Sequence, residues 1–402
     1  MKAESLNIAD SQEFSSPTAE TAELFAENEY LKKRVARAVM LRRAVWAACL
    51  ACAVFIIAGF TIFDWRLALG LCFEDGLIAA KNSVRAAELY RAAAEGGNVQ
   101  AQRRLGELLE KGNGVPQNYA EAVRWYSLAA EHGDMQAQYK LGNCFYEGHG
   151  VALNYEEAVK WYSKASEQGC LEARNALGRC YYYGQGTARD YDEAAKLFAE
   201  PAEKGVTEAC TNLGRCYIYG YGVSRDYEKG AQLTRKAAEQ GDAKAQNNLG
   251  VCYSQGYGVT VNAAEAVKWF RMAAEQGDSY GQKNLADCYL YGTRISMDWN
   301  QAFRLYSLAA EQGIPEAIRE LGVFYESGLY CKRDLQKAAA MYRRAADKGD
   351  DLSLIRLADM YQEGKGMEKD REEAVKLYIK AANRGCLSAM IRLKELGIEP
   401  YK

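Results

Sequence analysis

Residues 137–172 read AQYKLGNCFYEGHGVALNYEEAVKWYSKASEQGCLE, and this stretch decides the fold. Apolar residues recur at helical spacing in each half: Ala137, Leu141, Cys144 and Phe145 in the first, then Ala158, Trp161, Tyr162 and Ala165 in the second. Between the halves, Gly148-His149-Gly150 would interrupt a continuous helix. The stretch therefore predicts a helical hairpin, which must stack on neighbouring hairpins to bury its apolar faces.

The same pattern returns every 36 residues without insertion or deletion. Nine complete copies cover 65–388, and a half-copy runs from Ala389 to the end of the 402-residue chain. Strict phase of this kind predicts an all-α, right-handed superhelical solenoid of helix-turn-helix repeats over 65–402. Numbering each copy from 1 to 36, position 1 falls at Trp65, Ala101, Ala137, Ala173, Ala209, Ala245, Gly281, Ala317 and Ser353.

The chain has 36 glycines and only 5 prolines, and the repeat explains where the glycines go. One set follows each first helix and another follows each second helix, where left-handed caps are expected. A third set lies inside the first helix, where glycine costs about 1 kcal/mol relative to alanine. We expect a close approach by small residues of the paired helix, of the Ala122 and Ala130 type, to offset that cost.

The pattern A-x3-L-G-x2-Y-x2-G-x-G-V-x2-D/N-Y-x2-A-x2-W-Y-x2-A-A-x2-G resembles the Sel-1-like repeat, which is related to the tetratricopeptide repeat. The resemblance covers 65–402 and implies a helical scaffold that binds proteins. Three loops depart from it, at Ile78, at Arg294 and at Tyr330 with Cys331, and we expect these loops to differ in shape.

Three irregular residues fall in the fourth and fifth copies. Pro201 lies within a second helix, where it removes a backbone hydrogen bond. Gly230 and Thr234 replace the usual alanine and aromatic residue of the next copy. Together they predict a looser joint or an altered curvature around residues 195–235, and restoring the usual residues should raise thermal stability.

A membrane segment is predicted before the repeats. Residues 44–63, AVWAACLACAVFIIAGFTIF, are uncharged and long enough to span about 30 Å as a helix. Residues 30–43 are basic and predict a juxtamembrane helix, whereas 1–29 are acidic and predict a disordered tail. Because the basic side faces the cytoplasm, we expect a single-pass protein with a cytoplasmic N-terminus and extracytoplasmic repeats, either periplasmic or lumenal.

Six cysteines occupy position 8 of their copies, where other copies have Leu108, Phe324 and Met360. The position is therefore apolar. Copies stack about 10 Å apart, beyond the reach of a disulfide, so these cysteines should be free and packed as small hydrophobic residues. Free thiols favour a reducing compartment, in conflict with the charge bias, to which we give more weight because buried thiols are inert. The six are Cys72, Cys144, Cys180, Cys216, Cys252 and Cys288.

Catalytic and metal-binding motifs are missing from the sequence. No serine has a lysine three residues later, and neither a Gly-x-Ser-x-Gly elbow nor a His-Glu-x-x-His helix occurs. With only two histidines, zinc binding has few candidates, and a net charge of -2 argues against nucleic-acid binding. We expect no enzyme activity, cofactor, metal or small-molecule substrate.

The groove lined by the first helices is the predicted binding surface, by analogy with tetratricopeptide grooves. Its asparagine, arginine and tyrosine side chains suit an extended peptide, and Asn212, Asn248 and Asn284 could form a ladder along it. The alternative is that these side chains only fill gaps between copies. The candidates are Asn175, Arg179, Tyr182, Tyr183, Thr211, Asn212, Arg215, Tyr219, Asn247, Asn248, Lys283, Asn284 and Tyr291.

The sequence thus predicts a membrane-anchored scaffold or adaptor that binds a protein or peptide in its groove. Two alternatives stay open: a cell-envelope hydrolase, either β-lactamase-like or associated with peptidoglycan, and a purely structural spacer. Turnover of nitrocefin or muropeptides would favour the first, and failure to capture any partner would favour the second.

Overall fold

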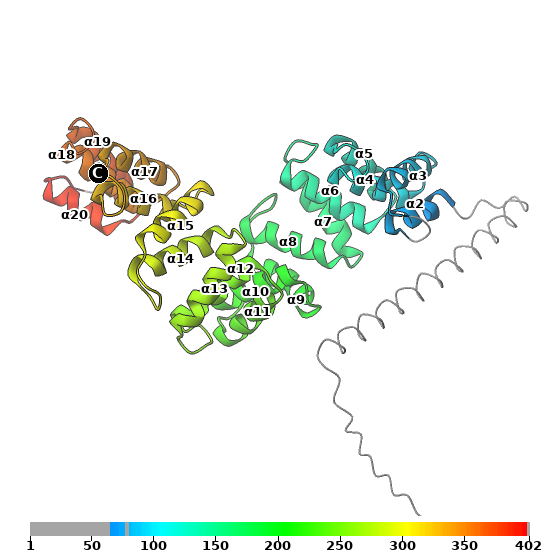
Figure 1. The fold of residues 1–402 in the computed structure, drawn as a ribbon, viewed down its shortest axis with the longest axis horizontal. Coiled ribbons are helices and arrows are strands. Elements are labelled where there is room, and N and C mark those ends of the chain that lie inside the picture. The colour runs from blue at the N-terminus through cyan, green and yellow to red at the C-terminus, as the bar shows by residue number, and fades with distance from the viewer. Residues whose placement is uncertain (1–64, 77–79, 400–402) are drawn as a thin grey trace, which may run out of the picture. The chain divides into compact units, whose positions relative to one another are not determined.

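The computed structural model describes residues 65–76 and 80–399. This part of the chain folds into nineteen α-helices, arranged as consecutive hairpins (Figure 1). The predicted acidic tail (1–29), basic helix (30–43) and membrane segment (44–63) lie outside the described residues. Within the described ranges, no helix is both long enough and apolar enough to cross a membrane.

The helices alternate between the first and second helix of each copy. The first helices are α2 (Trp65–Asp75), α4 (Val99–Lys111), α6 (Met135–Glu147), α8 (Leu171–Tyr183), α10 (Thr207–Tyr219), α12 (Ala243–Gln255), α14 (Ser279–Tyr291), α16 (Pro315–Ser327), α18 (Asp351–Glu363) and α20 (Leu387–Glu395). The second helices are α3 (Ser83–Glu95), α5 (Tyr119–Glu131), α7 (Tyr155–Glu167), α9 (Tyr191–Glu203), α11 (Tyr227–Glu239), α13 (Ala263–Glu275), α15 (Trp299–Glu311), α17 (Leu335–Asp347) and α19 (Arg371–Ala382).

Two compact units divide the chain between Trp161 and Tyr162, within α7. In the first unit, each helix from α2 to α6 packs against the next. In the second unit, helices α8 to α20 do the same, and first helices also contact each other, as α10 and α12 do. All the predicted groove residues belong to the second unit.

Side-chain caps begin the second helices. Asp226, for example, accepts the backbone N–H of Lys229 at 3.0 Å and so satisfies a donor at the start of α11 that no helix carbonyl reaches. First helices are less regular, because Cys170, Val206 and Ile314 stand at their N-caps without a side-chain bond. The N-cap side chain is therefore regular at the second helices and varies from copy to copy at the first helices.

The predicted left-handed glycines are confirmed at both helix ends. Gly220, after α10, has φ +74° and its N–H donates to the carbonyl of Cys216, which closes the helix. Gly241, after α11, has φ +94°. The glycines at the same two positions in the other copies share this conformation: Gly76, Gly112, Gly148, Gly184, Gly256, Gly292, Gly328 and Gly364 after first helices, and Gly97, Gly133, Gly169, Gly205, Gly277, Gly313, Gly349 and Gly385 after second helices.

The glycine inside the first helix makes room for a ring, and the prediction that small alanines approach it is wrong in most copies. A β-carbon on Gly322 would lie 2.6 Å from Cε1 of Tyr342, a fully buried side chain of the paired helix α17. Tyr90, Tyr126, Phe198 and Phe270 occupy the same place against Gly70, Gly106, Gly178 and Gly250.

The fifth copy is close-packed at Gly230, contrary to the expected looser joint, while the altered curvature stays a prediction. Thr234 cannot fill the space of a ring, and the backbones of α10 and α11 approach instead. A β-carbon on Gly230 would lie 2.7 Å from Cγ1 of Ile218 and 3.0 Å from the carbonyl oxygen of Gly214. Glycine is therefore used here for close approach. Helix α9 runs through Pro201 without a break.

Two of the irregular loops can be compared with the regular ones. Arg294 has φ +59°, close to the +66° of Gly258 at the same position one copy earlier, so the expected change at this residue is wrong. Tyr330 does not adopt a positive φ, and the loop of the eighth copy does differ. Ile78 lies outside the described residues.

Candidate peptide-binding surface on the first helices

The first helices of the second unit form the candidate surface. Contacts join α10 to α12 and α12 to α14. Burial raises the pKa of Tyr280, on α14, and Glu316, Asp278 and then Tyr183 add to the rise. Tyr183 belongs to α8, so first helices three copies apart lie close enough for their side chains to interact electrostatically.

Asparagines tie neighbouring copies together on this surface. Nδ2 of Asn212 donates to Oδ1 of Asn175 at 3.0 Å, and Nδ2 of Asn284 donates to Oδ1 of Asn247 at 2.7 Å. Asn175, Asn212 and Asn247 are buried. Asn248, the middle residue of the predicted ladder, is half-buried. The structure thus gives four of the predicted asparagines a role in linking copies, which reduces what they can offer to a peptide.

Other predicted polar residues are also engaged within the solenoid. Thr211 donates to Oδ1 of Asp242 at 3.1 Å. Lys283 forms an ion pair with Asp287 at 2.9 Å, one turn along α14. These contacts hold side chains in place on the surface, and the surface area left open comes mainly from tyrosines.

Tyrosine rings are the exposed part of the surface. Tyr183, Tyr219, Tyr280 and Tyr291 have 48%, 44%, 54% and 69% of their area exposed. Exposed aromatic side chains of this kind supply contact area and a hydroxyl at low entropic cost. Tyr280 is absent from the predicted set because it stands at position 36 of the sixth copy, just before the groove positions of the seventh copy.

The two arginines at position 7 of the fourth and fifth copies are held differently. Arg179 forms an ion pair with Glu208 at 2.9 Å, and Nδ2 of Asn175 donates to the same carboxylate. Arg215 instead lies over the ring of Tyr182, 4.3 Å from its centroid, and donates to the hydroxyl of Tyr183 at 3.1 Å.

Five buried tyrosines at position 26 bond carboxylates on the first helices. Each of the five donates its hydroxyl to a carboxylate of the same copy at 2.5 to 2.6 Å. Burial, and then the carboxylate, raise the pKa of these tyrosines, which keeps them neutral. The pairs are Tyr90–Glu74, Tyr126–Glu110 and Tyr342–Glu326 with position 10, and Tyr306–Asp287 and Tyr378–Asp359 with position 7.

The fourth to sixth copies have no such tyrosine. Phe198, Thr234 and Phe270 stand at position 26: the two phenylalanines have no hydroxyl, and the buried Oγ1 of Thr234 has no hydrogen-bond partner. Positions 7 and 10 of these copies accordingly hold no acid: Arg179 and Tyr182, Arg215 and Ile218, Val251 and Ser254. Within the second unit, the fourth to sixth copies therefore carry fewer acids at these two positions than the seventh to ninth copies.

The position 8 thiols are free and buried, as predicted. Burial raises the pKa of Cys144 to about 12 and that of Cys180, Cys216 and Cys252 to about 11. A neutral buried thiol is a poor nucleophile. In the described part of the chain, no group of three or more His, Cys, Asp or Glu side chains is placed to hold a metal ion.

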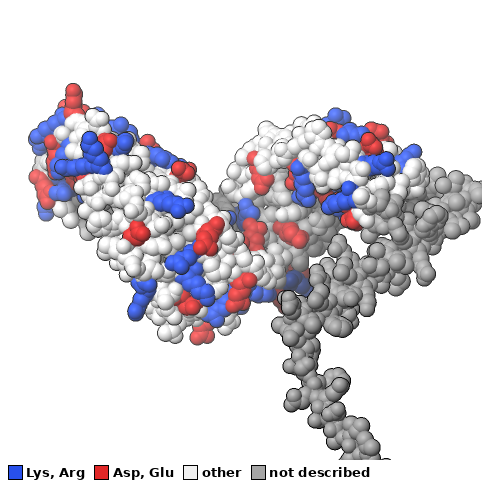
Figure 2. Space-filling view, viewed as in Figure 1, with Lys and Arg blue, Asp and Glu red and all other residues white. Residues whose placement is uncertain are grey.

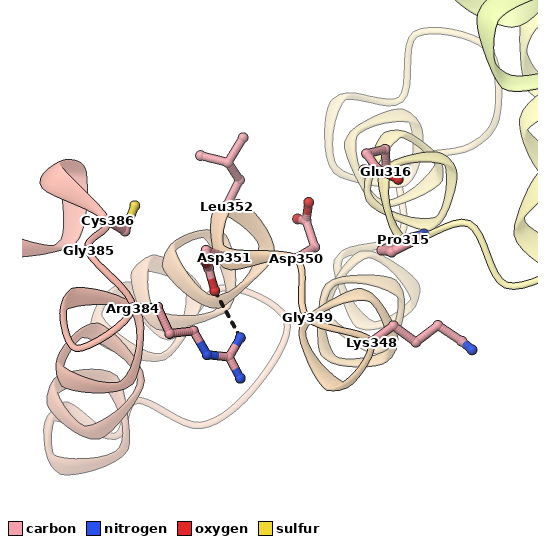
Figure 3. Close-up of a pocket in the computed structure, with 10 residues that line it drawn as sticks. All are labelled: Pro315, Glu316, Lys348, Gly349, Asp350, Asp351, Leu352, Arg384, Gly385 and Cys386. Carbon is pink, nitrogen blue, oxygen red and sulfur yellow. Dashed lines mark hydrogen bonds and ion pairs between the residues drawn. The ribbon is translucent and has the colours of Figure 1, made fainter. Parts of the chain in front are cut away.

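A hollow of about 300 Å³ lies near the C-terminal end, among the turns that precede α18 and α20 (Figure 3). Its walls mix charges, and Arg384 donates to Asp351 at 2.9 Å across it. Exposed Leu352 lies at its rim. The hollow holds neither a nucleophile with a base nor a set of metal ligands, so we do not treat it as the site.

Charges elsewhere are mixed. On the face shown in Figure 2, Lys and Arg side chains are interspersed with Asp and Glu side chains within each unit. Exposed ion pairs between neighbouring turns, such as Lys160 with Glu157, account for part of this pattern.

Comparison with known proteins relates the chain to a family of repeat proteins. The Sel1 repeat model matches nine times, at 65–98, 99–134, 136–170, 171–206, 207–242, 243–278, 279–314, 315–350 and 352–386. No curated protein matches. Among solved structures, the protective antigen c5321 of uropathogenic Escherichia coli strains is 35% identical, with a TM-score of 0.62, over 83% of this chain and 73% of that one.

A Sel1 repeat protein from Oxalobacter formigenes is 29% identical, with a TM-score of 0.52, over 77% of this chain and 89% of that one. Sel1 repeat proteins are generally non-catalytic scaffolds for protein interactions. Each of the nine matches covers one helical hairpin of the structure, and together they include every helix from α2 to α19. The chain belongs to the Sel1 repeat family.

Proposed function

We propose that this protein is a membrane-anchored scaffold that binds an extended segment of a partner protein along the first helices α8 to α14. The observation that carries the proposal is the set of exposed tyrosines, Tyr183, Tyr219, Tyr280 and Tyr291, on a surface of first helices whose asparagines are mostly engaged. Large exposed aromatic area on one face of a helical solenoid favours a protein interface.

The anchoring part of the proposal rests on sequence. Residues 44–63 have the length and apolarity of a membrane helix, and the basic residues before them favour a cytoplasmic N-terminus with extracytoplasmic repeats. Reporter fusions test this topology: alkaline phosphatase fused after Lys402 should be active, and green fluorescent protein fused there should be dark. The opposite result would place the repeats in the cytoplasm.

The binding surface is tested by photocrosslinking of the full chain in native membranes. A photoreactive phenylalanine analogue at Tyr219 should crosslink a discrete partner, whereas the same analogue at Leu308, an exposed residue of the second helix α15, should not. Equal crosslinking at both sites would contradict the proposal.

A substitution experiment complements the crosslinks. Replacing Tyr183, Tyr219 and Tyr280 together by serine should abolish recovery of the crosslinked partner in pull-downs. A matched variant replaces Val261, Met272 and Leu308, which are exposed on loops or second helices, and should keep the partner. Because all six side chains are exposed, both variants should fold, and circular dichroism checks this.

A further inference from the structure

We infer that the middle of the groove binds an acidic stretch of the partner peptide, with Arg215 as the residue that receives a carboxylate. The inference rests on the proposed function and names the chemistry of its partner. It is carried by a comparison of two equivalent arginines, at position 7 of the fourth and fifth copies.

In the fourth copy, the arginine at position 7 pairs with an acid of the solenoid itself. Arg179 reaches across to Glu208, the second residue of the next first helix, at 2.9 Å. Asn175 donates to the other oxygen of that carboxylate at 2.9 Å. Charge and hydrogen bonds are therefore satisfied within the solenoid.

The fifth copy has the same arginine without the carboxylate. Lys244 stands where Glu208 stands one copy earlier, so Arg215 has no acid to reach in the next first helix. Among the described residues, neither Arg215 nor Lys244 forms an ion pair. Arg215 turns back to Tyr182 and Tyr183, and its Nε is buried without a hydrogen-bond partner.

The nearby acids lie at helix starts, and none forms an ion pair with Arg215 or Lys244. Asp242 accepts from Thr211 and from the N–H of Ala245, as the cap of α12. Asp278 caps α14, and burial raises its pKa, while Lys244 acts in the opposite direction. Both carboxylates are thus held at helix starts, and the carboxylates that buried tyrosines place on other first helices are missing from the fourth to sixth copies.

The rings beside Arg215 complete the site. Tyr183 and Tyr219 are about half exposed, and Tyr183 holds the guanidinium edge with its hydroxyl. A guanidinium packed on a ring is preorganised to receive a carboxylate. The groove here offers two unpaired cations between tyrosines, which fits a segment of glutamate or aspartate flanked by residues that pack on rings.

The test uses the full chain in nanodiscs and two fluorescein-labelled peptides, Gly-Ser dodecapeptides with a central Glu-Tyr-Glu or Gln-Tyr-Gln. We expect fluorescence anisotropy to show about fivefold tighter binding of the acidic peptide, the gain from one partly screened ion pair. Raising the salt concentration should reduce this preference.

Two variants and one control assign the preference to this site. Arg215→Gln removes the receiving cation, and Lys244→Glu supplies an internal carboxylate like Glu208; both should abolish the preference, and Lys244→Glu should also raise the melting temperature. The double variant Arg179→Gln/Glu208→Gln removes the satisfied pair at no change in net charge and should keep the preference. Arg215→Lys, which retains the charge, controls for lost packing on Tyr182.

Several outcomes would overturn the inference: equal affinity for the two peptides, no measurable binding of the acidic peptide, or a preference that survives in both Arg215→Gln and Lys244→Glu. Displacement of the acidic peptide by excess sodium phosphate would identify a small-anion site instead. The proposed function fails separately, if the serine variants at Tyr183, Tyr219 and Tyr280 still recover the crosslinked partner.

Discussion

The fourth to sixth copies and the seventh to ninth copies build the same hairpin but fix its two helices differently. In the seventh to ninth, a buried tyrosine bonds a carboxylate on the first helix. In the fourth to sixth, Phe198, Thr234 and Phe270 make no such bond. In these six copies, a tyrosine at position 26 goes together with an acid on the first helix, which links packing to binding chemistry. The third copy differs, since it has Tyr162 with Asn143 and Tyr146 at positions 7 and 10.

The tyrosine pairs follow a second rule. Where the residue inside the first helix is glycine, as at Gly322, the hydroxyl of Tyr342 reaches Glu326 at position 10. Where it is alanine, as at Ala286 and Ala358, the hydroxyl reaches an aspartate at position 7. The position of the accepting acid thus varies with the residue inside the first helix, although the hydroxyl of Tyr378 also donates to Oε1 of Gln362, at position 10, at 3.3 Å.

The largest expected effect distinguishes the two regions by pH. Burial raises the pKa of Cys180, Cys216 and Cys252, one in each of the fourth to sixth copies, to about 11. The seventh to ninth copies have a single such thiol, Cys288, with Phe324 and Met360 at the same position of the other two. Below about pH 9 the thiols are neutral in both states and their stability is fully present. Between about pH 9 and pH 11 only the unfolded state ionises, so stability is lost as the pH rises, by up to about 1.4 kcal/mol per unit for each thiol.

Urea denaturation at a series of pH values measures this. Replacing the three cysteines by alanine should flatten the alkaline loss of stability while lowering stability at neutral pH. An unchanged slope in the triple variant would show that these thiols do not ionise on unfolding in that range.

Next in size is Gly322→Ala in the eighth copy. Its β-carbon would displace the ring of Tyr342 and break the bond to Glu326, at a cost of about 2–3 kcal/mol in the free energy of unfolding. Adding Val323→Asp supplies the acid that accompanies alanine in the seventh and ninth copies. Chemical denaturation should show that this second change restores part of the loss; additivity of the two costs would contradict the rule.

Gly230→Ala probes the close approach in the fifth copy. The new methyl group meets Cγ1 of Ile218 at 2.7 Å and the backbone at Gly214, so we expect a loss of about 2 kcal/mol despite the better helix propensity of alanine. Differential scanning calorimetry gives the melting temperature. A higher value than the wild type would revive the interpretation of a loose joint.

The smallest expected effect comes from giving the fourth copy the position 26 tyrosine of the seventh to ninth copies. Phe198→Tyr adds a buried hydroxyl opposite Tyr182 and Arg179, with no carboxylate to accept it, and should cost about 1–2 kcal/mol. Tyr182→Glu in the same chain provides the acceptor at position 10. A double-mutant cycle should give a favourable coupling free energy between the two changes. A coupling near zero would show that the residue at position 26 and the acid at position 10 act independently.

Much of the fold could be predicted from the sequence, because a 36-residue period fixes where helices begin and end. The left-handed glycines and the free thiols at position 8 follow from columns of residues that repeat in phase, and both are confirmed. The residue that meets the glycine inside the first helix could not be predicted, since spacing gives the face of a helix but not the reach of a ring such as Tyr342.

The candidate surface was harder to predict for a related reason. Position alone put Asn212 and Asn284 in the groove, but their bonds to Asn175 and Asn247 cross from one copy to the next and depend on side-chain direction. Lys244 carries a signal that sequence could have revealed. Comparing position 36 across copies shows glutamate at Glu172, Glu208 and Glu316, and a lysine in the fifth copy alone.

The tyrosine–carboxylate bonds join residues only 16 or 19 apart, so each begins and ends within a single copy. The buried tyrosine and the carboxylate that it bonds therefore belong to the same 36-residue copy. If recombination were to duplicate or delete one 36-residue block that has such a pair, the groove would gain or lose one carboxylate. The tyrosine–carboxylate bonds of the remaining copies would not change. A solenoid of this kind can change the partners it accepts by editing whole blocks, with no need for compensating changes at distant residues.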